Sequence, residues 1–185
     1  MRQSMTQNKT LTPLQMLLDL ERRSRRQAAE LPQKIEITEM WNGIAFRIGD
    51  MQMVAPMNEV SEILDMPELT RIPNAKPWVL GIANVRGNLL PVMDLSGYLF
   101  GKSTRTHKRS RLLVVNHESI NSGLLVDEVY GMRHFEKENW NKKLPTHDKV
   151  LKPYVDRCYK DEERTWLVFS IHKLAESPSF HQSGL

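Results

Sequence analysis

The sequence predicts a mainly β protein, made of small barrels or a sandwich, for three reasons. Short apolar segments follow one another closely between residues 43 and 170, and glycine or proline punctuates them. Few segments have helical periodicity, so the βαβ units that build a parallel sheet are not expected. The 185 residues, 40% hydrophobic and 26% charged, suffice for one domain or two small subdomains that share a core.

A helix is expected near the N-terminus, in the stretch LTPLQMLLDLERRSRRQ. Thr12 is a suitable N-cap, Pro13 a suitable first helical residue, and Gln15 the partner in a capping box. Four arginines near the end of this run suit the negative end of the helix dipole, and Pro32 is expected to stop it. The arm, residues 1–34, either docks on its own domain or binds a membrane surface or a partner.

Short strands are expected to follow the arm. GIAFRIGDMQMVAP predicts two strands that meet at a Gly49–Asp50 turn. EVSEIL predicts a third strand, with Val60, Glu62 and Leu64 on one face. GIANVRG and LLPVMDL predict two more, joined through Gly87–Asn88, a pair that tolerates the positive φ of a tight turn.

Short strands separated by turns are also expected in the second half of the chain. Asp94 is a natural N-cap for a short helical turn in DLSGYLFG, and SIHKLAES predicts a last helical segment. Between them RLLVVNH, SGLLVDEVYGM and TWLVFSI predict further strands. We expect a main domain at residues 35–176, with a subdomain boundary near residues 102–111, and a polar, disordered tail at 177–185.

The net charge of +4 is concentrated in two places. The arm carries a balance of +4, and residues 102–111, KSTRTHKRSR, here called the basic segment, carry five basic residues and no acid. The remaining residues are acidic on balance, with 14 basic against 19 acidic side chains. A small nucleic-acid-binding barrel that uses the basic segment is the alternative hypothesis. No aromatic residue is interleaved in the segment to stack on bases, so a solvated or disordered connector is favoured.

The expected location is the cytoplasm. Cys158 is the single cysteine, which excludes an internal disulfide and fits a reducing compartment. No run of 18 apolar residues occurs and no signal-peptide pattern follows Arg2, so direct insertion into a membrane is not expected.

No catalytic, metal or cofactor site is predicted. Gly97 and Gly101 precede Lys102 and Ser103, but a phosphate-binding loop needs four residues between its glycines, and here there are three. The six histidines are scattered, and no G-x-S-x-G motif occurs. We therefore expect no enzyme.

Arg86 is the residue that requires an explanation, because it stands among apolar neighbours. It must reach solvent or pair with a carboxylate, and Glu62 and Asp94 are candidate partners. One hypothesis is an internal ion pair that stabilises the fold. The other is an arginine presented at a barrel rim to a protein partner, since arginine is favoured at binding hot spots.

Three ordered motifs resemble a known family. TRIPNAKPWVLGIANVRGNLLPVMDL, residues 70–95, is similar to the N-L-R-G-x-x-x-P-V-x-D-L signature of CheW-like chemotaxis adaptors. FRIGDMQMVAPMNEVSEIL resembles the opening hairpin and V-x-E-I strand of that family, and GLLVDEVYGM its V-D-x-V segment. The resemblance covers about residues 43–176. Val85 stands where the family often has leucine, and the N-terminal helix is additional.

The resemblance implies a fold of two five-stranded, SH3-like β-barrels side by side. It implies a non-catalytic adaptor without a cofactor, which couples the cytoplasmic tip of a membrane chemoreceptor to a histidine kinase. The kinase partner would be its own CheW-like regulatory domain, and nucleic acid would not be a partner. The extra helix and the segment VAPMNEVSEIL most resemble those of the adaptors of type IV pilus twitching-motility systems.

The resemblance also implies a partner-binding site. The positions that match the two family motifs are Val60, Glu62 and Ile63 for V-x-E-I, and Asn84, Arg86 and Gly87 for N-L-R-G. In the family these regions lie at or near the receptor-binding groove and its supporting ion pair. We therefore predict that the charged groups of Glu62 and Arg86 lie close together.

Overall fold

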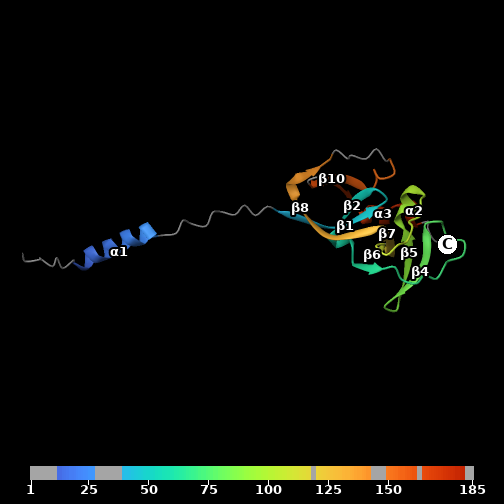
Figure 1. Cartoon of the computed structure of the whole chain (residues 1–185), viewed down its shortest axis with the longest axis horizontal. Coiled ribbons are helices and arrows are strands. Elements are labelled where there is room, and N and C mark those ends of the chain that lie inside the picture. The colour runs from blue at the N-terminus through green and yellow to red at the C-terminus, as the bar shows by residue number, and fades with distance from the viewer. Residues whose placement is uncertain (1–11, 28–38, 118–119, 143–148, 162–163, 182–185) are drawn as a thin grey trace, which may run out of the picture. The chain divides into compact units, whose positions relative to one another are not determined.

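The chain divides into two units, Met1–Ile37 and Thr38–Leu185 (Figure 1). The computed structural model describes residues 12–27, 39–117, 120–142, 149–161 and 164–181.

The first unit contains one helix, α1, Pro13–Gln27. It begins as the sequence predicts, because the Thr12 N–H donates to Oε1 of Gln15 at 3.0 Å. An ion pair one turn apart, between Arg23 and Asp19 at 2.7 Å, lies on its surface. Pro32, the expected end of the run, lies outside the described residues, and the role of the arm stays a prediction.

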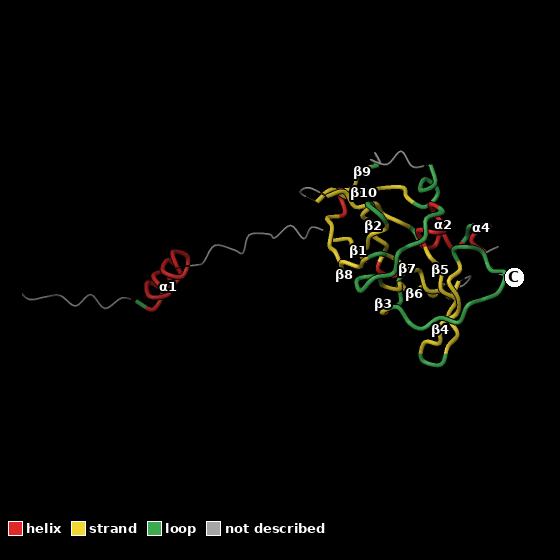
Figure 2. Tube along the Cα trace, turned by 45° about the vertical axis from the view of Figure 1, so that its right-hand side comes forward, coloured by secondary structure: helices red, strands yellow, loops and turns green. Residues whose placement is uncertain are grey.

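Two β-sheets form the second unit (Figure 2). Sheet A consists of β1 Met40–Ile48, β2 Met51–Pro56, β8 Glu128–Glu136, β9 Trp140–Asn141, β10 Val155–Asp161 and β11 Arg164–Phe169. Sheet B consists of β3 Glu62–Asp65, β4 Val79–Val85, β5 Asn88–Asp94, β6 Arg111–His117 and β7 Ile120–Val126. The strand orders are β8-β1-β2-β11-β10-β9 and β3-β6-β7-β5-β4. The mainly β prediction is confirmed, although the two-residue β9 gives sheet A six strands instead of five.

Sheet B is a continuous stretch of chain inserted into sheet A. The predicted boundary near the basic segment is therefore corrected, because β5 before that segment pairs in parallel with β7 after it. The chain leaves sheet A through the 3-10 turn η1, Met57–Glu59, and returns to it at Asp127. Parallel pairs need long crossovers, and neither β5–β7 nor β2–β11 can be recognised from local patterns.

Short helices cover the sheets, and capping residues define where they begin. Helix α2, Leu95–Phe100, begins as predicted, because a carboxylate oxygen of Asp94 accepts from the Gly97 N–H at 3.1 Å. A second 3-10 turn, η2 Lys137–Asn139, joins β8 to β9. The C-terminal helices are α3 Ile171–Ala175 and α4 Pro178–His181. The expected polar tail thus contains a helix, and its Phe180 is only 2% exposed.

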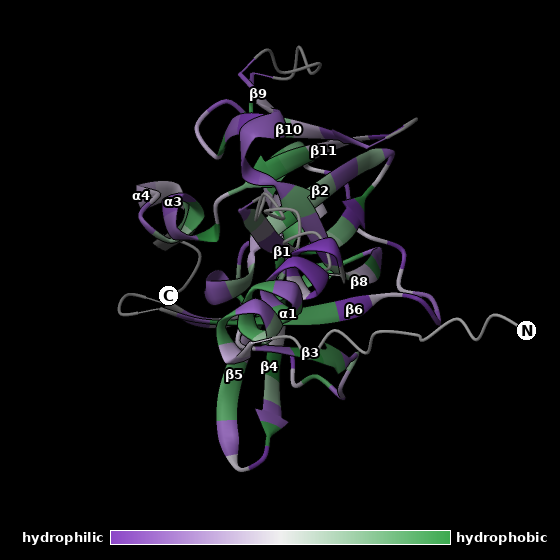
Figure 3. Cartoon of the chain, turned by 90° about the vertical axis from the view of Figure 1, so that its left-hand side faces the viewer, coloured by the Kyte–Doolittle hydropathy of each residue, from purple (hydrophilic) through white to green (hydrophobic). Residues whose placement is uncertain are grey.

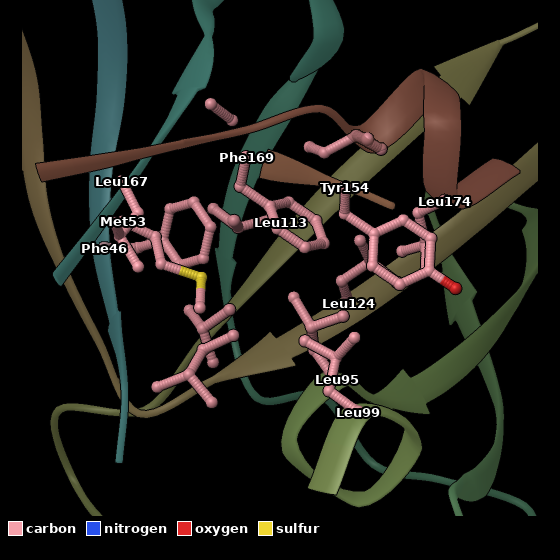
Figure 4. Packing of buried hydrophobic residues seen from close by; sticks show 14 of the residues in the cluster. Phe46, Met53, Leu95, Leu99, Leu113, Leu124, Tyr154, Leu167, Phe169 and Leu174 are labelled. Carbon is pink, nitrogen blue, oxygen red and sulfur yellow. The ribbon is translucent and has the colours of Figure 1, made fainter. Parts of the chain in front are cut away.

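The hydrophobic core is continuous between the two sheets (Figure 4). Its largest cluster includes Phe46 and Phe169 from sheet A together with Leu113 and Leu124 from sheet B. Adjacent residues of the same strands face the other way, into a separate cluster inside each sheet. The central strands, such as β2, β6 and β7, therefore contribute one face to the cluster of their own sheet and the other to the shared core.

Candidate functional site

The candidate site lies where sheet B closes on itself. Its edge strands, β3 and β4, carry the two family motifs. Thr70, which follows β3 in the chain, joins the two edges by exchanging two backbone hydrogen bonds with Ile82 of β4, at 2.9 and 2.8 Å. Gly81 has a φ of 147°, and a Cβ there would press against the carbonyl group of Thr70. This close approach of β4 to the segment that follows β3 requires glycine.

The predicted contact between Glu62 and Arg86 is confirmed. The guanidinium donates through Nη1 to Oε2 of Glu62 at 3.1 Å and through Nη2 to Oε1 at 2.5 Å. The Glu62 side chain is 30% exposed and that of Arg86 is 75% exposed. Such a bidentate pair fixes the direction of both groups, but its exposure limits its contribution to stability.

The turn that presents Arg86 is unusual in its backbone. Arg86 has a φ of 52° and Gly87 a φ of 86°, so both central residues of the β4–β5 hairpin are left-handed. The turn is therefore Arg86–Gly87, one residue before the predicted Gly87–Asn88. Oδ1 of Asn84 accepts from the Gly87 N–H at 2.9 Å and holds it. Figure 3 shows this hairpin extending from the rest of the sheets.

Apolar side chains are also exposed on the strands that carry the ion pair and on β5. Ile63 follows Glu62 on β3 and is exposed, whereas Val60 precedes the strand and packs against the shared core. Leu89, three residues after Arg86, is 71% exposed. The sequence analysis did not identify Leu89, which it counted only among the apolar neighbours of Arg86. We call Glu62, Ile63, Arg86 and Leu89 the closure surface.

Two buried carboxylates hold the architecture and do not form a reactive pair. Glu59 accepts from the Ile171 N–H at 2.5 Å and the His172 N–H at 3.3 Å, which joins η1 to the start of α3. Asp94 caps α2 and also accepts from the backbone and hydroxyl of Thr104. Each carboxylate is satisfied by donors from a neighbouring segment, as buried charges require.

The described residues contain no arrangement with obvious chemistry. No three His, Cys, Asp or Glu side chains among them gather as a metal site would require. Burial raises the pKa of the Cys158 thiol, the opposite of what a nucleophilic cysteine needs. In the described part, no helix combines the length and apolar character needed to cross a membrane. The exposed closure surface can recognise another molecule by charge and apolar contact.

The chain belongs to the CheW-like domain family, a class of adaptor proteins, and the family model matches residues 42–179. It is similar to Protein PilI of Pseudomonas aeruginosa, with 46% identity over 169 residues, 91% of this chain and 94% of that protein. It is 32% identical to the chemotaxis protein CheW of Helicobacter pylori over 61% of this chain and 68% of that protein.

A solved structure shares the fold. The scaffolding protein TtCheW of Thermoanaerobacter tengcongensis matches with a TM-score of 0.64 and 24% identity, over 76% of this chain and 95% of that one. The identity is low, so this match supports the architecture alone. As a member of a family of non-catalytic adaptors, the chain is not an enzyme.

Proposed function

We propose that this chain couples the cytoplasmic tip of a chemoreceptor to a histidine kinase, through the CheW-like regulatory domain of the kinase. The system it serves controls type IV pilus twitching motility, and the adaptor works in the cytoplasm at membrane receptor arrays. Membership of the CheW-like family supports the coupling role. The 46% identity to Protein PilI over nearly the whole chain supports the pilus assignment.

The proposed partner-binding residues are those that match the family motifs, Val60, Glu62, Ile63, Asn84, Arg86 and Gly87. The observation that carries the proposal is the exposed bidentate pair of Glu62 with Arg86 at the sheet closure. Arg86 is presented by a turn with a defined backbone, so binding should cost little backbone conformational entropy. Arginine beside exposed apolar side chains is a frequent hot spot of protein interfaces.

The test is to replace Arg86 by Glu and to measure binding and thermal stability together. We expect affinity for the receptor tip or the kinase regulatory domain to fall by about tenfold or more, the effect of losing one interface hot spot. Because the pair is mostly exposed, the midpoint of thermal unfolding should fall by only about 2 to 4 °C.

A charge-swapped variant, Glu62→Arg with Arg86→Glu, is the matched control. It can restore the ion pair and the stability, but it presents the partner with reversed charges. Binding that recovers together with stability would show that the pair is structural. Wild-type protein that binds neither partner would refute the proposed function itself.

A further inference from the structure

The basic segment, residues 102–111, has a defined shape. The N–H and hydroxyl of Thr104 donate to the buried carboxylate of Asp94 at 2.6 and 2.7 Å. Near the other end, the buried Ser110 accepts at Oγ from the His107 N–H at 3.0 Å. Of the two expectations, a solvated connector agrees with the exposure of most of this segment, and a disordered one is corrected, because Thr104 anchors the segment to Asp94.

The cations of this segment divide into two groups. Arg109 pairs with Glu128 at 3.5 Å, and Arg111 pairs with Asp65 at 3.2 Å. Lys102, Arg105 and Lys108 are exposed, and no carboxylate of the described residues forms an ion pair with them. The segment thus displays three uncompensated positive charges from an anchored backbone.

The basic segment lies at the end of sheet B opposite the Arg86 turn, because Thr104 is bound to Asp94, the last residue of β5. The segment ends at Arg111, which is paired in register with Asp65 at the end of β3. Neighbouring strands are about 4.8 Å apart, and the three residues from Asp65 to Glu62 span about 10 Å. A partner that docks along β3 therefore has to extend beyond Asp65 to reach the basic segment.

We propose that Lys102, Arg105 and Lys108 receive a carboxylate-rich segment of the protein that docks on the closure surface. This inference rests on the proposed function and adds the chemistry of the partner. Exposed charges at the rim of an interface accelerate association and reject partners of the wrong sign. The anchored loop keeps these charges in place before the partner arrives.

Nucleic acid fits these observations less well than an acidic polypeptide. The basic segment has no aromatic side chain on which a base could stack. Outside this segment and the arm, the chain has 14 basic and 19 acidic residues, a balance that repels a phosphate backbone.

The test uses the triple variant Lys102→Glu, Arg105→Glu and Lys108→Glu of the full chain, with the kinase regulatory domain as the probe. Its matched control reverses three exposed lysines elsewhere in the domain, Lys149, Lys152 and Lys160. At about 0.05 M salt we expect the triple variant to associate about tenfold more slowly than wild type, and the control to associate normally. At about 0.5 M salt the difference should nearly vanish because the charges are screened.

Equal association rates of the triple variant and wild type at low salt would overturn the inference. So would salt-dependent binding of a duplex or single-stranded oligonucleotide by wild type that the triple variant loses. Wild type that does not bind the kinase domain would refute the proposed function. In that case titration with a polyglutamate peptide decides the inference: binding lost only in the triple variant supports it, and equal binding by all three proteins refutes it.

Discussion

Replacing Gly81 by Ala should open the closure of sheet B. Gly81 lies in β4 beside Thr70, and its φ of 147° is a conformation that residues with a Cβ rarely adopt. The added Cβ would also meet the backbone of Thr70, with the carbonyl carbon at 3.0 Å. Backbone atoms cannot rotate away as a flexible side chain can, so the two segments have to separate.

The size of the effect follows from what the separation breaks. The two hydrogen bonds between Thr70 and Ile82 contribute about 1 kcal/mol each. The unfavourable φ adds about 1 to 2 kcal/mol for a residue with a Cβ. The free energy of unfolding should therefore fall by about 3 kcal/mol. For a domain of this size the midpoint of thermal unfolding would fall by about 6 to 12 °C.

The assay is thermal unfolding followed by circular dichroism, with Gly49→Ala as the matched control. Gly49 also has a positive φ, 57°, but a Cβ there would meet nothing within 4 Å. The control should lose only the conformational term, about 1 kcal/mol. A Gly81→Ala protein that melts at the same temperature as the control would refute the view that this close approach holds the closure.

Two further predictions concern the core. Because Cys158 is fully buried and burial raises the pKa of its thiol, a thiol reagent at about pH 8 should modify the native protein at least about 100-fold more slowly than the urea-unfolded protein; similar rates would contradict this. Phe180→Ala should lower the free energy of unfolding in urea by about 3 to 5 kcal/mol, because Phe180 is buried in the shared core. Leu89→Ala, at an exposed position, should change it by about 0.5 kcal/mol or less, and equal effects of the two changes would show that α4 does not pack as described.

The sequence predicted the parts of the fold that depend on neighbouring residues. The Gly49–Asp50 turn and the caps formed by Thr12 and Asp94 involve partners within a few residues. The helix and strand patterns that they bound were therefore recognisable. The contact of Glu62 with Arg86 was also predicted, but from the family resemblance.

The parts that could not be predicted depend on partners far along the chain. Glu59 looked like the start of a strand, but its carboxylate binds the N–H of Ile171, 112 residues later. The register of the hairpin was misplaced by one residue, because a left-handed arginine at position 86 is uncommon and only the glycine suggested a positive φ. The exposure of Leu89 likewise depends on how sheet B closes.

The insertion of sheet B between β2 and β8 also sets the order in which a newly made chain can become complete. Every strand of sheet B is available once residue 126 has left the ribosome. The β1–β2 hairpin is synthesised earlier, but it lacks both of its neighbours, β8 and β11, until much later. An isolated hairpin is marginally stable in water. The first strands of the domain to be synthesised are therefore among the last to be paired on both sides. A chain that ends before β11 leaves β2 with an unpaired edge.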